Sequence, residues 1–505
     1  MLLFAYQLSG ILKLIVFRNR TGHMTSIQRL AKVKVRYLVL ATLLLFFIVN
    51  YAAYALTIAY DLPEGDHWRW LRGGLIPFLE GDKNFWQFLT LEFLPFSHSH
   101  IPTLFEVWLN YHLFGLDYRV ESWLGLAGMF AVFYFLCRQY WQNPGNDVPD
   151  AAKAAVIISF ALVLLNMTNI LSWTLVQFEN LYLLGTIFYL ALADKYFSTG
   201  QGKTALLWAT LVIFFLGDAM GNAAILSVLG FVVFFSPRRE YRLLLQIIVL
   251  LVVCTVFSLI FMKGVNPLDL LFNRENTPLA STGNGSGPGI VSYVLANLFD
   301  FCKTILMLLS EATNAPGVFR FYFNAWALAR YMVGLGVAVF MAVAILSYFY
   351  YRKRLLNTAL PMLMILFTLA SMAGIILTRF QAFGLDIASA TRYVRLFEIG
   401  LVGALWINSA LLVKIFREWQ LFWLTSLTAF VCGGILVIGF SMGSYYYWRF
   451  PGSVLKNRED IAAAFRQYAE DDSFPVGDFH ARCMNHYCRD AIAFLKDNEL
   501  SLFRH

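Results

Sequence analysis

The chain has 505 residues, of which 59% are hydrophobic and 14% are charged, and its mean hydropathy is +0.62. This composition excludes a soluble globular protein and indicates a polytopic membrane protein. The net charge of +8 does not point to nucleic acid in such a chain, because lysine and arginine accumulate on the cytoplasmic loops of membrane proteins.

Residues 1–35 are predicted to form a cytoplasmic or interfacial N-terminal region. The stretch from Leu2 to Phe17 is apolar but leads into Arg18 and Arg20 without the small-residue cleavage site of a signal peptide, so an interfacial helix is expected there. Met24 is an alternative start to Met1.

Hydrophobic stretches separated by short basic clusters predict transmembrane helices, because in lipid a helix satisfies the hydrogen bonds of its own backbone. Strands of a barrel would alternate polar and apolar residues, and these stretches do not. We therefore predict an all-α membrane protein with about eleven transmembrane helices. The spans are placed at residues 36–59, 122–140, 154–171, 180–196, 204–217, 220–235, 243–262, 331–349, 358–377, 397–414 and 420–443.

The basic clusters set the orientation of these spans. Clusters such as Arg29 to Arg36 and Arg352 to Arg354 all fall on the cytoplasmic side if the N-terminus is inside and the C-terminus outside. The chain then divides into a transmembrane domain, residues 36–443, and a small extracytoplasmic C-terminal region, residues 444–505. The transmembrane domain carries two large outer segments, a first loop at 61–121 and a second at 263–330.

The first loop contains the best candidate for a catalytic group. Asp66 lies just outside the first span with aromatic neighbours at Trp68, Trp70 and Phe85. Partial desolvation by such neighbours raises the pKa of a carboxylate and suits it to act as a general base on a hydroxyl group. The alternative is that Asp66 is an ordinary turn-forming acid beside a glycine.

Two histidines of the same loop are candidate ligands for a phosphate or a hydroxyl group. His98 and His100 form a His-x-His pair, and a structural zinc site is not expected because no cysteine is near and the acids are dispersed. Residues 101–114 predict an amphipathic helix, with His112 as an interfacial residue.

Residues 290–311 are apolar but carry Asp300, Lys303 and Glu311, and they are predicted to form an amphipathic helix on the outer face. The run from Ser281 to Gly289 before it has the composition of a flexible connection or of a mobile loop over a site. In the C-terminal region, Cys483 and Cys488 predict a disulfide, with free thiols as the alternative.

Three more residues are candidates for binding. Arg392 and Tyr393 stand at the outer entry to the tenth span, where an arginine either snorkels to the interface or presents its planar fork to a phosphate. Gln177 lies in the turn between the third and fourth spans, where it either caps the hairpin or rims a cavity that opens outward.

The order of these motifs resembles that of an uncharacterised bacterial group of membrane proteins similar to the GT-C superfamily of glycosyltransferases. The resemblance rests on Asp66-His67-Trp68 after the first span, on Arg392-Tyr393 near a late span, and on the ending from Leu495 to Arg504. The group also has an Asn-Glu-His-Arg motif in the first loop, of which this chain keeps only His100.

The resemblance implies an inverting glycosyltransferase of the bacterial cytoplasmic membrane, acting on its outer face. The partners would be a polyprenyl-phosphate sugar donor, a glycan or glycolipid acceptor and the lipid bilayer, with no nucleic acid. Asp66 would be the catalytic base, and Arg392, Tyr393 and His100 would hold the donor phosphate. Some members of the superfamily need a divalent cation, and no cofactor is otherwise implied.

Three alternatives stay open at this point. A ligase or polymerase of lipid-linked glycans would need the same outward loops and phosphate-binding groups. A transporter or flippase would carry ionisable residues in mid-span or broken helices in two repeated halves, and the predicted spans contain almost none of these. A scaffold that binds a partner would not need Asp66.

Overall fold

The computed structural model describes residues 26–63, 65–91, 100–145, 148–165, 174–236, 240–258, 260, 296–313, 326–383, 393–418, 441–445, 447–449, 451–470 and 487–504. Within these ranges every regular element is a helix, which agrees with the predicted all-α class. The chain separates into two compact units, residues 1–46 and residues 47–505. All contacts described below belong to the second unit.

Apolar helices of 14 to 33 residues make up most of the described chain. They are α2 (Ser26–Ile58), α7 (Arg119–Gln142), α8 (Asp150–Leu164), α9 (Thr174–Thr199), α10 (Lys203–Leu216), α11 (Asp218–Phe234), α12 (Tyr241–Phe257), α17 (Trp326–Leu355), α18 (Leu360–Phe383) and α19 (Val394–Glu418). Each overlaps one of the predicted spans. The eleventh predicted span, 420–443, lies almost entirely outside the described residues.

Four of these helices contain a segment that is long and apolar enough to cross a membrane: Leu40–Ile58, Arg119–Gln142, Leu328–Tyr351 and Val394–Glu418. Shorter apolar helices accompany them, among them α10 with 14 residues. At 1.5 Å per residue such a helix measures about 21 Å, less than the roughly 30 Å of the hydrocarbon core. The structure thus indicates a membrane protein, while the full number of crossings remains a prediction.

The helices of the bundle pack pairwise: α7 on α9, α18 on α19, α11 on α18 and α17 on α19. Small residues allow the closest approaches. A Cβ added to Gly403 of α19 would come within 2.4 Å of the carbonyl oxygen of Pro361, and one added to Gly400 would meet the Thr368 hydroxyl at 2.5 Å. Gly403 therefore lets the backbones of α18 and α19 touch, and Gly400 makes room for the side chain of Thr368.

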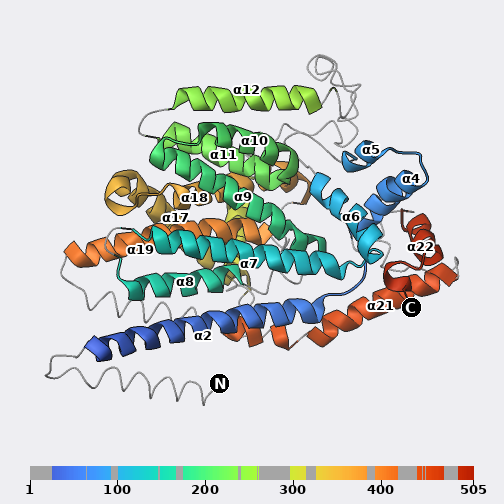
Figure 1. Ribbon diagram of the computed structural model, residues 1–505, viewed down its shortest axis with the longest axis horizontal. Coiled ribbons are helices and arrows are strands. Elements are labelled where there is room, and N and C mark those ends of the chain that lie inside the picture. Colours follow the sequence, from blue (N-terminus) through green and yellow to red (C-terminus); the bar gives the residue numbers. More distant parts are fainter. Residues whose placement is uncertain are drawn as a thin grey trace. The chain divides into compact units, whose positions relative to one another are not determined.

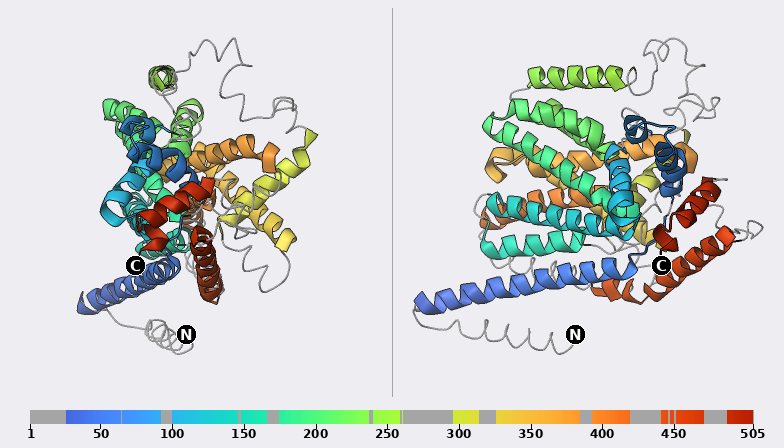
Figure 2. Two further views of the ribbon diagram at one scale, coloured as in Figure 1. Left: turned by 90° about the vertical axis from the view of Figure 1, so that its right-hand side faces the viewer. Right: turned by 45° about the vertical axis from the view of Figure 1, so that its right-hand side comes forward.

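Short helices of the first loop form a separate cluster at one end of the bundle, together with helices from residues 451–504 (Figures 1 and 2). We call this cluster the head. It consists of α3 (Asp66–Trp70), the π-helical turn η1 (Leu71–Leu75), α4 (Ile76–Leu79), α5 (Phe85–Leu89), α6 (Ile101–Phe114), α21 (Pro451–Glu470), α22 (Tyr487–Asp497) and the 3-10 turn η9 (Ser501–Phe503).

The head has its own hydrophobic core, which the two distant parts of the chain build jointly. Trp68 and Leu104 of the first loop are buried in it beside Phe465 and Leu495 of the C-terminal region, and the rings of Trp68 and Phe465 lie 4.9 Å apart. The C-terminal region is thus part of the same folded body as the first loop.

The predicted helix at 101–114 is confirmed as α6. Its buried side chains include Glu106 and Asn110, and its exposed ones include Phe105 and Leu113, so it does not divide into an apolar buried face and a polar exposed one as predicted.

One further helix, α15 (Leu298–Glu311), packs against α17 and matches the C-terminal part of the predicted amphipathic segment 290–311. Leu308 and Leu309 are buried in that contact, whereas Leu298 and Phe299 are exposed. The Gly/Ser-rich run 281–289 lies outside the described residues.

Candidate functional site

Asp66 begins α3, immediately after Gly65, whose φ of 57° is readily adopted only by glycine. Its side chain is 24% exposed and pairs with Arg69, with an Nη2 to Oδ1 distance of 3.3 Å. In contrast, the next residues, His67 and Trp68, are 1% exposed, and Trp70 is fully buried. The backbone of Asp66 is therefore fixed by packing while its carboxylate stays accessible.

His67 is held by a carboxylate inside the head. Its Nε2 lies 3.0 Å from each carboxylate oxygen of Glu121, and both side chains are almost completely buried. Its ring also packs at 4.5 Å from that of Tyr118. Since His67 directly follows Asp66, these contacts tie the start of α3 to the start of α7.

A second buried carboxyl group stands beside this pair. Glu106 of α6 is 6% exposed, and its Oε1 accepts a hydrogen bond from Asn110 Nδ2 at 3.2 Å. Burial, followed by the charge of Glu121 and a side-chain hydrogen bond with it, raises the pKa of Glu106 well above its ordinary value. Glu106 thus favours its neutral form. We call His67, Glu106, Asn110 and Glu121 the buried polar cluster.

A hydrogen-bond network beside the cluster connects Asp61 and the end of α6 with residues 500–504. Arg504 donates through Nη2 to Asp61 Oδ2 at 2.6 Å and through Nη1 to the Phe114 carbonyl oxygen at 2.6 Å. Asp61 also accepts hydrogen bonds from the Tyr118 backbone and the Ser501 hydroxyl, each at 3.1 Å. This network joins the end of the first span to the end of α6.

Two acids of this network have shifted pKa values in opposite directions. Burial, then the nearby charge of Asp117, raises the pKa of Asp61 in spite of Arg504. Burial also opposes the ionisation of Asp117, but its hydrogen bonds with Arg119 outweigh that effect and lower its pKa. Arg119 Nη2 lies 2.6 Å from Asp117 Oδ2. Asp117 is therefore the more strongly ionised of the two acids.

The other predicted site residues are placed only in part. His100 precedes α6, and its ring packs 5.2 Å from that of Trp70, which in turn lies 5.8 Å from the ring of His67. His100 is thus in the same neighbourhood as Asp66. Tyr393 is partly exposed just before α19. His98, Arg392 and the side chain of Gln177 lie outside the described residues.

The aromatic neighbours expected to shield Asp66 have other partners. Trp68 and Trp70 are buried, and Phe85 packs against Phe78 and Trp108, with its ring 5.2 Å from the indole of Trp108. Trp68 and Trp70 are thus core residues of the head, and Phe85 packs at its surface. The first loop contains two Glu-Gly-Asp sequences, at 64–66 and at 80–82, and Asp82 of the second is exposed.

Arg395, which follows the predicted Arg-Tyr pair, points into the bundle. It is 5% exposed, donates from Nη1 to the Leu164 carbonyl oxygen at 2.7 Å and lies 3.3 Å from Glu398 Oε2. Its Nη2 donates to the Tyr51 hydroxyl. Arg395 thus links α2, α8 and α19 through groups of the protein itself.

Glu106, Glu121, Asp61 and Arg504 belong to this neighbourhood in the structure but were not among the residues predicted from the sequence. Glu106 could have been singled out, because it is the one acidic residue in the mainly apolar segment 101–114 and lies four positions before Asn110, on the same helical face. No local pattern connects Asp61 with Arg504, since 443 positions separate them.

Cys488 forms a disulfide, as expected for this region, and its predicted partner Cys483 lies outside the described residues. In the described part of the chain, no three His, Cys, Asp or Glu side chains are grouped so that they could hold a metal ion.

Comparison with known proteins leaves the assignment to the residues themselves. No family model, no curated protein and no solved structure matches this chain.

Proposed function

We propose that this chain is a membrane glycosyltransferase that moves a sugar from a polyprenyl-phosphate donor to a glycan or glycolipid acceptor on the outer face of the bacterial cytoplasmic membrane. The proposal rests on the position of the Asp66 side chain. Its carboxylate is partly exposed at the start of α3, on a backbone fixed by the buried residues His67, Trp68 and Trp70. A general base needs this combination of access and fixed position.

In the proposed reaction, Asp66 accepts the proton of an acceptor hydroxyl group. The hydroxyl oxygen attacks the anomeric carbon of the sugar from the side opposite the phosphate. The bond from the anomeric carbon to the phosphate oxygen breaks, and the lipid phosphate leaves with the electron pair. This single displacement inverts the anomeric configuration, and positive charge develops on the sugar ring in the transition state.

The buried polar cluster acts as support in this proposal. Glu121 holds His67, the residue next to Asp66, and this contact orients the backbone that carries the base. His100 is the described candidate closest to this part of the head for the donor phosphate, through its contact with Trp70. Arg392, Tyr393, His98 and Gln177 remain proposed ligands of the same phosphate.

The test is the replacement Asp66→Asn, which keeps the size and hydrogen-bonding capacity of the side chain but removes the base. We expect transfer to fall by about 10² to 10⁴-fold, the usual contribution of a general base. The measurement is mass analysis of surface glycans from cells that carry each variant, together with the amount of inserted protein.

Asp82→Asn is the matched control, because Asp82 is an exposed acid in the second Glu-Gly-Asp of the same loop. It should leave transfer at the wild-type level. Normal glycans from a correctly inserted Asp66→Asn protein would refute the assignment of the base.

A further inference from the structure

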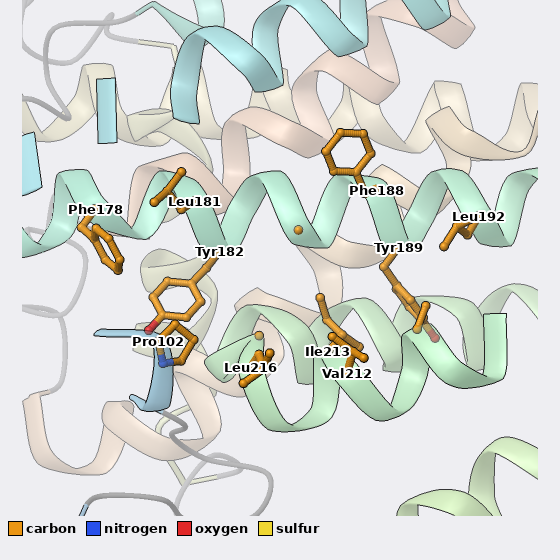
Figure 3. A pocket seen from close by; sticks show the side chains of 13 residues that line it. Pro102, Phe178, Leu181, Tyr182, Phe188, Tyr189, Leu192, Val212, Ile213 and Leu216 are labelled. Carbon is orange, nitrogen blue, oxygen red and sulfur yellow. The ribbon is translucent and has the colours of Figure 1, made fainter. Parts of the chain in front are cut away.

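An apolar groove runs along the helix bundle between α9 and α10 (Figure 3). Its volume is about 370 Å³, within the range of small-molecule pockets. From α9 it is lined by residues between Phe178 and Leu192, including Gly185, and from α10 by residues such as Val212 and Ile213. Fourteen positions of α9 correspond to about 21 Å at 1.5 Å per residue. The groove is thus long, narrow and almost without polar groups.

One end of the groove lies at the head. Pro102 at the start of α6 lines this end together with Tyr182, and Figure 3 shows the two side chains beside each other. The Tyr182 hydroxyl accepts a hydrogen bond from the Thr103 backbone at 3.1 Å and shares another with the Thr103 hydroxyl. These bonds fasten the start of α6 to α9 at the mouth of the groove.

The flanks of the groove face the surroundings of the bundle. Phe188 is 47% exposed and Val212 is 52% exposed, and both line the groove. In a membrane protein such side chains contact hydrocarbon, so a hydrocarbon chain can enter from the side without crossing a polar barrier. A soluble ligand would find no hydrogen-bonding partner along most of this length.

The groove leads toward the proposed active site. Pro102 is two residues from His100, whose ring packs on Trp70, and Trp70 packs on His67 beside Asp66. A phosphate attached to a chain in the groove would therefore emerge near His100.

We propose that this groove holds the isoprenoid chain of the polyprenyl-phosphate donor, with the phosphate at the start of α6. The inference rests on the proposed function and adds the location of the lipid chain. Gly185 is the position that tests it. A Cβ built there meets only Ile213 Cδ1 at 4.0 Å, so a larger side chain can fill the groove without displacing a neighbouring helix.

The experiment uses the full-length protein in lipid nanodiscs and farnesyl phosphate with a photoreactive diazirine at the far end of its chain. We expect labelling of peptides from α9 or α10, and Gly185→Leu should reduce it at least fivefold. Gly230→Leu is the matched control, since Gly230 also lies inside a helix, α11, and a Cβ there meets nothing within 4 Å. It should label like the wild type.

A diazirine-bearing phosphatidylcholine identifies bulk lipid. If it labels the same peptides as strongly as the isoprenoid probe, and Gly185→Leu affects both equally, the groove holds ordinary membrane lipid and the proposal is wrong. Absence of isoprenoid labelling in α9 and α10 also overturns it.

The two proposals fail separately. Retained transfer in Asp66→Asn with labelling lost in Gly185→Leu would remove the catalytic assignment and keep the isoprenoid site. Loss of transfer in Asp66→Asn with no labelling of the groove would do the reverse.

Discussion

Glu106 lies in the interior of the head beside a second carboxyl group, Glu121, and this arrangement makes its protonation part of folding. Because the pKa of Glu106 is raised in the folded protein, the folded state binds more protons than the unfolded state above the ordinary value of 4.5. The contribution of protonated Glu106 to the free energy of unfolding is therefore complete below about pH 4.5. It is lost as the pH rises through the folded-state pKa.

Glu106→Gln should remove this dependence. Glutamine keeps an acceptor for Asn110 and provides a donor toward Glu121 without a titratable proton. We expect the wild-type free energy of unfolding to decline as the pH rises above 4.5, by at most about 1.4 kcal/mol per pH unit, and that of Glu106→Gln to decline less. The measurement is thermal unfolding of the purified protein in detergent across pH 4.5 to 8.

Glu80→Gln serves as the control, because Glu80 is an exposed acid of the same loop. Its profile should follow that of the wild type. If the stability of Glu106→Gln changes with pH in the same way as that of the wild type, Glu106 does not hold a proton in the folded state.

At the scale of helices, α15 and α17 cross with almost no space between their backbones. A Cβ on Gly334 would lie 1.9 Å from the Leu306 carbonyl oxygen, so no other residue fits there unless the helices separate. An ion pair reinforces the crossing, with Arg330 Nη2 at 2.7 Å from Glu311 Oε1. These contacts fix α15 along α17.

Gly334→Ala should separate the two helices and destabilise the protein by about 1 to 3 kcal/mol, the usual cost of overpacking. Gly336→Ala is the matched control: it adds the same Cβ atom to the same helix at a position where that atom meets nothing within 4 Å. It should be neutral or slightly stabilising because alanine favours helix. Thermal unfolding of both variants in detergent checks this. Equal thermal midpoints for the two variants would mean that α15 moves away from position 334 without loss of stability.

Helices of this kind could be predicted from sequence because apolar runs are a local signal. The helix 101–114 agreed with α6 to the residue, since Pro102 and Gly115 mark its ends in the sequence itself. The crossing of α15 and α17 could not be predicted, because the fit of Gly334 to Leu306 depends on tertiary packing. The candidate base Asp66 was proposed from its motif, whereas the contact of the neighbouring His67 with Glu121 spans 54 positions and has no local signal.

At the scale of the whole molecule, Arg504 connects the C-terminal region to the first loop. Arg504→Ala would leave Asp61, already partly desolvated, without its charged partner. Removing one member of a hydrogen-bonded charge pair costs about 1 to 3 kcal/mol. We therefore expect faster hydrogen exchange in residues 114–121 and lower activity of the proposed transferase.

Asp61→Asn in the Arg504→Ala background should restore part of the stability, because it removes the unpaired charge. Lys456→Ala is the control, since Lys456 is an exposed cation of α21. Equal exchange in Arg504→Ala and Lys456→Ala would mean that the pair does not stabilise the head.

The shared core of the head also sets the order of events during synthesis. Asp61 and Arg504 are 443 positions apart, and a ribosome that adds 5 to 20 residues per second needs about 20 to 90 s for that distance. Throughout this interval the apolar faces of α3 and α6 lack the side chains of α21 and α22 that cover them in the finished protein. A nascent chain that stops early would keep these faces exposed to chaperones and proteases, so the assembly of the head distinguishes finished chains from interrupted ones.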